Sequence, residues 1–158
     1  MTRGKVGSLV GGEMARRDGF HHSVVKALQK DGWIITHDPL RLELRGLKLE
    51  ADLGAEKFFA AEKEGRKIAV EVKDFGSESP TNVLEKTIGQ LQLYQLALND
   101  VQKERTLFLA ITKDVYNNLF STPAFTLIVE QNKINLLVFD QKQEVIVQWI
   151  NQESTPTF

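Results

Sequence analysis

The sequence lacks three features that would place it in well-defined classes of protein. It has no cysteine, which excludes a disulfide framework and thiol chemistry and fits a reducing, cytoplasmic setting. It has no run approaching the ~20 apolar residues of a membrane-spanning helix. Its net charge is only −1, whereas a protein that holds nucleic acid along its whole length is usually basic. These absences predict a globular protein without a membrane partner that contacts nucleic acid only locally.

The length of 158 residues is typical of one domain. Residues 1–13 are glycine-rich and have no periodicity, so we expect a flexible leader, with Met14 as an alternative start. Residues 14–150 carry the hydrophobic patterns of a single domain. Residues 151–158 are expected to form a flexible tail.

Hydrophobic periodicity predicts helices and strands in a mixed order. The first part of the chain is expected to contain a helix at 16–30 and strands at 33–36, 40–45, 47–53, 58–62 and 67–73. A long helix then runs from Pro80 to Asn99. The remaining elements are a strand at 105–112, helices at 114–120 and 124–132, and strands at 134–139 and 144–150. This order predicts an α/β fold in which helices flank a mixed β-sheet.

The strand at 67–73 ends in an acidic and a basic residue that face the same way. Side chains alternate along a strand, so Glu71 and Lys73 share one face. In the preceding strand Asp52 lies opposite the apolar face. If the two strands are neighbours, Asp52 and Glu71 converge with Lys73 beside them.

Such a pair of carboxylates requires a proton, a cation or separation, because two charges about 4 Å apart repel by about 4 kcal/mol at an effective dielectric of 20. Mg²⁺ or Mn²⁺ would supply the cation, since Mg²⁺ binds one or two carboxylates and keeps waters that can attack a phosphate. The triplet Glu71-Val72-Lys73 alone is weak evidence, because alternating charges usually form a solvated strand face. The aspartate before it and the long helix after it favour a site.

These residues match a known signature. Asp52 … Glu71-Val72-Lys73 resembles the PD-(D/E)xK motif of the restriction-endonuclease-like superfamily, although Ala51 stands where the motif has its proline. The resemblance implies a restriction-endonuclease-like fold. It also implies Asp52, Glu71 and the Val72 carbonyl as metal ligands, with Asp52, Glu71 and Lys73 as catalytic residues.

Two further features are similar to the RecB-like exonuclease branch of that superfamily. Gln90-Leu91-Gln92-Leu93-Tyr94 matches its Q-x-x-x-Y motif, and His21 lies in the first helix, where the branch has a metal-binding histidine. The resemblance implies substrate contacts from Gln90 and Tyr94 and a metal bond from His21. Packing roles remain open for all three, at the helix edge for Gln90 and Tyr94 and as a half-buried residue for His21.

A longer likeness runs from Met14 to about Ile150. It is carried by Phe20-His21, Asp31-Gly32-Trp33, Thr36-His37-Asp38-Pro39-Leu40, Asp52-Leu53-Gly54-Ala55-Glu56-Lys57, Ala60-Ala61-Glu62-Lys63 and Ile68-Ala69-Val70-Glu71. In these segments the chain resembles the XisH family, the fdxN-element excision controlling factors of cyanobacteria. The resemblance implies a role beside a site-specific recombinase in programmed DNA rearrangement, with a small companion protein of the XisI type.

Two functions remain open at this point. The first is a Mg²⁺- or Mn²⁺-dependent deoxyribonuclease. The second is a catalytically inactive DNA-binding or adaptor protein that regulates a recombinase, which the net negative charge favours. A homo-oligomer is compatible with either function.

Overall fold

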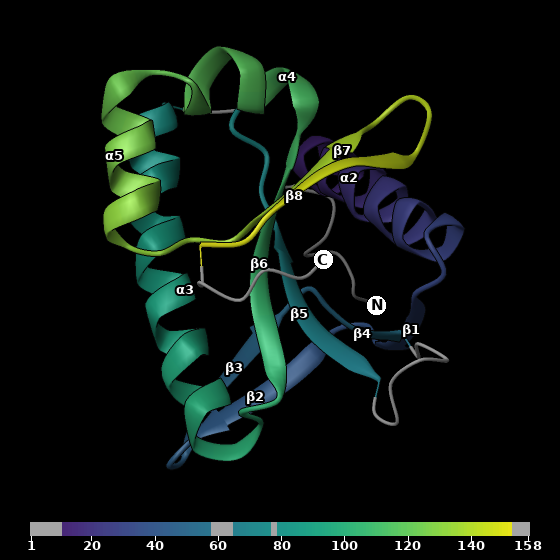
Figure 1. Cartoon of the computed structure of the whole chain (residues 1–158), viewed down its shortest axis with the longest axis vertical. Coiled ribbons are helices and arrows are strands. Elements are labelled where there is room, and N and C mark those ends of the chain that lie inside the picture. Colours follow the sequence, from purple (N-terminus) through teal and green to yellow (C-terminus); the bar gives the residue numbers. More distant parts are fainter. Residues whose placement is uncertain (1–10, 58–64, 77–78, 153–158) are drawn as a thin grey trace.

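The computed structural model describes residues 11–57, 65–76 and 79–152. In this part of the chain a six-stranded β-sheet lies between helices, and a two-stranded sheet sits beside it. Figure 1 shows helices α3 (Pro80–Val101) and α5 (Pro123–Gln131) on one side of the sheet and helix α2 (Gly11–Lys30) on the other. No helix within these ranges is long and apolar enough to cross a membrane. The prediction of a mixed sheet flanked by helices is confirmed.

Two glycines allow the turns in the N-terminal part. Helix α2 ends at Asp31-Gly32, where Gly32 has a φ of 93° that a residue with a Cβ rarely adopts. Strand β1 (Ile34–His37) follows, and then a hairpin of β2 (Leu40–Leu44) and β3 (Leu47–Ala51). Arg45 and Gly46 connect the hairpin with φ values of 49° and 97°. Two positive φ values are the requirement of a tight two-residue hairpin turn.

The large sheet combines antiparallel and parallel pairs. Its spatial order is β1, β4 (Leu53–Lys57), β5 (Arg66–Val72), β6 (Arg105–Thr112), β7 (Leu136–Asp140) and β8 (Val145–Ile150). Strands β5, β6 and β7 are parallel, whereas β4 and β8 run antiparallel to their neighbours. Parallel neighbours require crossover connections. Helix α3 makes the first crossover, and α4 (Lys113–Val115), the π-helix η1 (Tyr116–Phe120) and α5 make the second.

Alternation along the central strands builds a separate apolar core on each face of the sheet. Ala69 of β5 belongs to the core under α3, together with Leu91 of that helix. The next residue, Val70, belongs to the core under α2, together with Leu28 and Phe108. The β2–β3 hairpin packs on the α3 side, because its buried residues belong to the same core as Ala69 and Leu91.

The prediction of one strand over 47–53 is wrong. Strand β3 ends at Ala51 in the two-stranded sheet, and β4 begins at Leu53 in the six-stranded sheet, so Asp52 lies at a junction. Ala51 is buried in the core under α3, whereas Leu53 is buried in the core under α2. The chain therefore changes from one face of the large sheet to the other at Asp52. The apolar alternation continues through this change, which is why the sequence resembles a single strand.

The observed bounds of the other helices and strands differ less from the predicted ones. Helix α2 begins at Gly11 rather than Arg16, and the helix predicted at 114–120 consists of α4 followed by η1. The strand predicted at 58–62 lies outside the described residues, as do residues 1–10 and 153–158 of the predicted leader and tail.

The core under α2 provides a test of the fold. Phe108 is fully buried and its ring lies 4.9 Å from that of Trp149. We expect Phe108→Ala to reduce the free energy of unfolding by about 3–5 kcal/mol, because the change removes contacts and leaves a cavity. Ile34→Ala is the matched control, since Ile34 is 67% exposed, and it should change stability by under about 0.5 kcal/mol. Urea unfolding of both variants measures the difference, and equal losses would contradict this packing.

Candidate functional site

The first residue of the site, Asp52, is buried at the junction of β3 and β4. Its side chain is 6% exposed. The carboxylate Oδ2 accepts a hydrogen bond of 2.8 Å from the backbone N–H of Val72, the last residue of β5. This bond satisfies a buried backbone donor. It also holds the junction against the end of β5.

Glu71 and Lys73 lie at that same end of β5. Glu71 is 4% exposed, and its register neighbour on β6 is Leu109, whose side chain belongs to the core under α3. Paired residues of neighbouring strands point to the same face, so Glu71 faces α3. The Lys73 Nζ lies 3.3 Å from Glu71 Oε2. The structure therefore brings together the three residues that the sequence singled out as catalytic.

The electrostatic environment of Glu71 disfavours its charged form. Burial, followed by the negative charge of Asp52, raises the pKa of the Glu71 carboxyl to about 7 against the lowering effect of Lys73. The second carboxyl oxygen, Oε1, is buried and has no hydrogen-bond partner among the described residues. A buried acceptor without a partner is costly. The position thus favours a proton or a cation.

The donor chemistry fits a hard divalent cation. Asp52 and Glu71 provide two neighbouring carboxylates, which is the number that Mg²⁺ commonly takes from a protein while keeping several waters. The buried Oε1 of Glu71, which has no hydrogen-bond partner among the described residues, is an oxygen whose cost of burial a cation would offset. Within the described ranges, no group of three or more His, Cys, Asp or Glu side chains could hold a metal ion. The fit therefore rests on the two carboxylates.

His21 is not brought to this pair. Its Nε2 lies 2.8 Å from Asp38 Oδ1, in the turn after β1. His21 belongs to α2, which covers the face of the sheet opposite α3, whereas Glu71 faces α3. The sequence contains no spacing signal for the His21–Asp38 contact, because the two residues belong to different elements.

Gln90 and Tyr94 lie one turn apart on α3 and have different surroundings. Tyr94 is 4% exposed and belongs to the core under α3. Gln90 is half-buried, and its Oε1 is buried without a hydrogen-bond partner among the described residues. Tyr94 thus contributes to packing, while Gln90 keeps an acceptor that the described residues do not use.

The fold and these residues define a mixed α/β protein with a buried carboxylate pair and a lysine at the end of its central sheet. The family model described as XisH protein matches residues 14–147, and the chain belongs to this family.

Two solved structures are similar over nearly their whole length. An XisH family protein from Nostoc punctiforme PCC 73102 is 40% identical, with a TM-score of 0.78, and the match covers 85% of this chain and 100% of that one. A fdxN element excision controlling factor protein from Anabaena variabilis is also 40% identical, with a TM-score of 0.77, over 85% and 99% of the two chains. No curated protein matches the chain.

The raised pKa of Glu71 predicts a pH-dependent stability in the absence of metal. The folded protein binds this proton more tightly than the unfolded chain, whose glutamate has the usual pKa of 4.5. The stabilisation is therefore complete below about pH 4.5 and is lost as the pH rises to about 7. Between pH 5 and 8 in EDTA, wild type should lose up to about 3 kcal/mol relative to Glu71→Gln.

Urea unfolding at both pH values measures this difference. Glu85→Gln, at an exposed position of α3, is the control and should follow wild type. If Glu71→Gln also follows wild type at both pH values, the assigned pKa shift is wrong.

Proposed function

We propose that this XisH-family chain is a metal-dependent, endonuclease-like protein of the PD-(D/E)xK, restriction-endonuclease-like superfamily that acts on DNA during excision or site-specific rearrangement. The observation that carries the proposal is the buried pair of Asp52 and Glu71 with Lys73 Nζ 3.3 Å from Glu71. The mixed sheet, with a long helix directly after the strand that holds Glu71, supports the fold assignment.

In the proposed site Asp52, Glu71 and the carbonyl of Val72 would hold Mg²⁺ or Mn²⁺. The ion would supply Lewis acidity for phosphodiester hydrolysis. The hydrogen bond from the Val72 N–H keeps the Asp52 carboxylate in position. His21 contacts Asp38, and its helix covers the face of the sheet opposite Glu71, so among the proposed ligands we assign it the least important role.

Lys73 is proposed to act on the phosphate rather than on the ion. Its ammonium stabilises the negative charge that grows as a water oxygen attacks phosphorus. The bond between the water oxygen and phosphorus forms and the bond to the leaving oxygen breaks, while the proton that the water loses passes to solvent and the leaving oxygen takes up a proton from solvent. Gln90, with its unpartnered Oε1 on the helix above the same face, is proposed to contact the substrate. Tyr94 is proposed to support Gln90 from the core.

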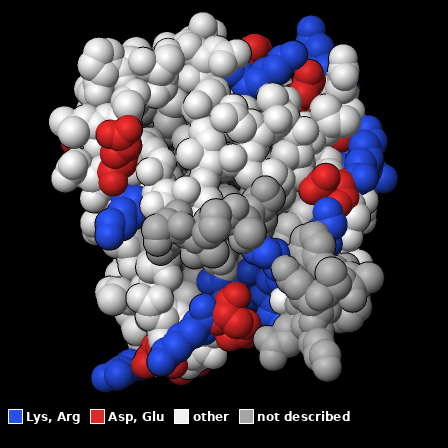
Figure 2. Space-filling model, in the orientation of Figure 1, with Lys and Arg blue, Asp and Glu red and all other residues white. Residues whose placement is uncertain are grey.

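The charge distribution favours a contact with DNA that covers only a small part of the protein surface. Figure 2 shows basic side chains on the displayed face interspersed with acidic ones rather than gathered into one continuous surface. With a net charge of −1, the chain gains little general attraction to phosphate. DNA recognition is therefore proposed to depend on partners. The similar Anabaena variabilis protein is an excision controlling factor, so we propose a companion protein of the XisI type and a site-specific recombinase.

The second candidate is a catalytically inactive adaptor with the same fold. The absence of a third metal-ligating side chain beside Asp52 and Glu71 within the described ranges favours it. So does the low net charge. In this case the acidic site carries out no catalysis, and the chain regulates a recombinase through its companion protein.

A cleavage assay on several DNA forms with Mn²⁺, with and without the companion, separates the two functions. We expect wild type to cleave, Asp52→Asn to lose both Mn²⁺ affinity and cleavage, and Lys73→Ala to lose about 10²–10³-fold in turnover. Mn²⁺ affinity in Lys73→Ala should be unchanged or slightly higher, because an ammonium opposes cation binding. Lys103→Ala, an exposed lysine outside the site, is the control and should behave like wild type.

Two other results of the cleavage assay would contradict the proposal. If wild type does not cleave in any arm and Lys73→Ala only weakens DNA association, more strongly at low salt, the chain is an adaptor. If wild type and Lys73→Ala cleave equally well, the proposed role of Lys73 is wrong.

A further inference from the structure

Helix α3 exposes leucines on the side that faces away from the sheet. Leu91 and Leu98 are buried in the core under this helix, whereas Leu93 is 39% exposed and Leu96 is 55% exposed. An outward helix face usually carries charged side chains, but the sequence has none from Thr87 to Asn99. This face therefore has the composition of a contact between helices rather than of a solvated surface.

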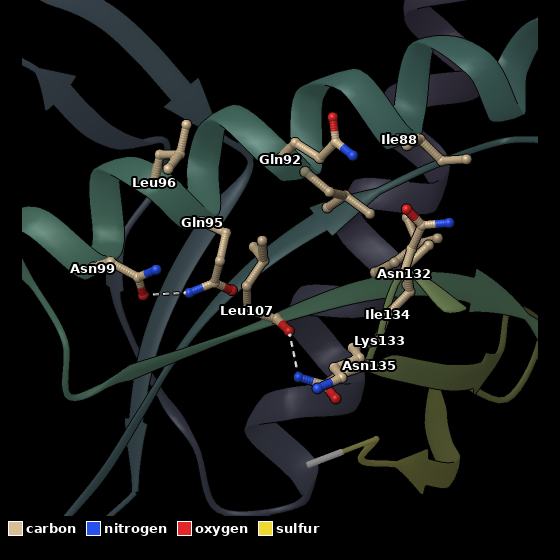
Figure 3. A pocket seen from close by; sticks show the side chains of 12 residues that line it. Ile88, Gln92, Gln95, Leu96, Asn99, Leu107, Asn132, Lys133, Ile134 and Asn135 are labelled. Atoms are coloured by element: carbon tan, nitrogen blue, oxygen red, sulfur yellow. Dashed lines mark hydrogen bonds between the residues drawn. The ribbon is translucent and has the colours of Figure 1, made fainter. Parts of the chain in front are cut away.

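A neighbouring flank of α3 borders a cavity of about 580 Å³, which β6 and residues 132–135 enclose from the other side (Figure 3). Gln95 and Asn99 line this flank, and Figure 3 shows Gln95 Nε2 donating to Asn99 Oδ1 at 2.9 Å. Leu96 also lines the cavity, whereas Leu93 does not. The exposed leucines thus extend from the edge of the cavity onto the outer side of the helix.

Gly89 lies on the same outer side, four residues before Leu93. A Cβ at Gly89 would meet no atom within 4 Å, so the packing of the described residues does not require a glycine there. A glycine in the middle of a helix is destabilising relative to alanine, and it is used where another backbone or a ligand approaches closely. Gly89 therefore leaves a notch between exposed side chains.

The outer side of α3 has the repeat of a helix pair. Its exposed residues follow one another at alternating intervals of four and three, as in a coiled-coil seam that repeats every 3.5 residues or so, on the order of one heptad per two turns. These residues, the outer stripe, are Asn82, Lys86, Gly89, Leu93, Leu96 and Asp100. The stripe has a cation near one end, an anion at the other, and a notch and two leucines between them.

We propose that two copies of the chain associate along the outer stripe, with their α3 helices antiparallel about a two-fold axis at the level of Leu91. Gly89 and Leu93 are equally far from Leu91 in the sequence. In this register Leu93 of each copy therefore packs into the notch at Gly89 of the other copy.

The charges of the stripe select the antiparallel orientation. In the same register Lys86 of each copy lies beside Leu96 of the other, so its apolar stem covers the leucine while its ammonium reaches Asp100. A parallel pair would instead place Lys86 against Lys86 and Asp100 against Asp100, which is repulsive. Arg45 Nη2 of the same chain lies 3.4 Å from Asp100 Oδ1, and a carboxylate can accept hydrogen bonds from more than one cation.

The stripe also indicates a second copy rather than an unrelated protein. A contact about a two-fold axis uses the same surface on both partners, so that surface must carry both halves of every match. The outer stripe does so, because one helix provides the notch and the leucine that fills it, and also the lysine and the aspartate. An unrelated partner would require only one half of each match.

The stripe is short, so we expect the dimer to be weak. From Asn82 to Asp100 it spans about 27 Å, at a rise of roughly 1.5 Å per residue. One helix pair of this length falls among the interfaces below about 1,200 Å², which are typical of transient complexes. The dimer is therefore expected to dissociate in the micromolar range.

Sedimentation equilibrium of the full chain, at concentrations from about 1 to about 500 μM, tests the proposal. Gly89→Gln should weaken the dimer by about tenfold or more, because the new side chain fills the notch. The urea midpoint of the dilute monomer should stay unchanged or rise, since glutamine favours a helix interior more than glycine does. Leu93→Gln should weaken the dimer to a similar degree. Leu127→Gln is the matched control, because Leu127 is 56% exposed on α5, and it should associate like wild type.

Charge reversal then tests the antiparallel register. Lys86→Glu and Asp100→Lys should each weaken the dimer several-fold, and the double variant should regain wild-type association. If the double variant associates no better than the single ones, the register is wrong.

Two results would overturn the association itself. One is a wild type that stays monomeric at the highest concentration. The other is equal weakening by Leu127→Gln and Leu93→Gln, which would assign the contact to another surface. DNA cleavage is not measured, so these outcomes are independent of the nuclease proposal.

Discussion

The hydrogen bond from the Val72 N–H to the Asp52 carboxylate is the interaction on which the arrangement of the site depends. It fixes the point at which the chain leaves the two-stranded sheet, changes from one core to the other and enters the large sheet. It also places a buried negative charge beside Glu71. The bond thus joins the element that carries Asp52 to the strand that carries Glu71.

Burying two carboxylates together costs free energy, which the raised pKa of Glu71 expresses. At neutral pH the pair is close to the balance between holding a proton and being fully charged. Lys73 offsets part of the repulsion without satisfying Glu71 Oε1. A divalent cation is the simplest partner for this group, and it would displace the proton on binding.

Strand alternation was enough to predict β1, β5, β6, β7 and β8 of the large sheet and the shared direction of Glu71 and Lys73, but it missed β4. It was not enough at Asp52, because an uninterrupted apolar alternation hid the change of sheet. The His21–Asp38 contact and the cavity beside α3 could not be predicted from spacing, since both depend on how elements pack. The XisH resemblance is confirmed, while the superfamily assignment and the metal chemistry stay proposals.

Calorimetric titration with Mn²⁺ at pH 7, in two buffers of different ionisation enthalpy, tests the central claim most directly. Because the pKa of Glu71 is about 7, binding to wild type should release about half a proton per ion. Glu71→Gln should bind much more weakly and release none. No Mn²⁺ binding by wild type, or equal binding and proton release by Glu71→Gln, would contradict the claim that this pair is a metal site.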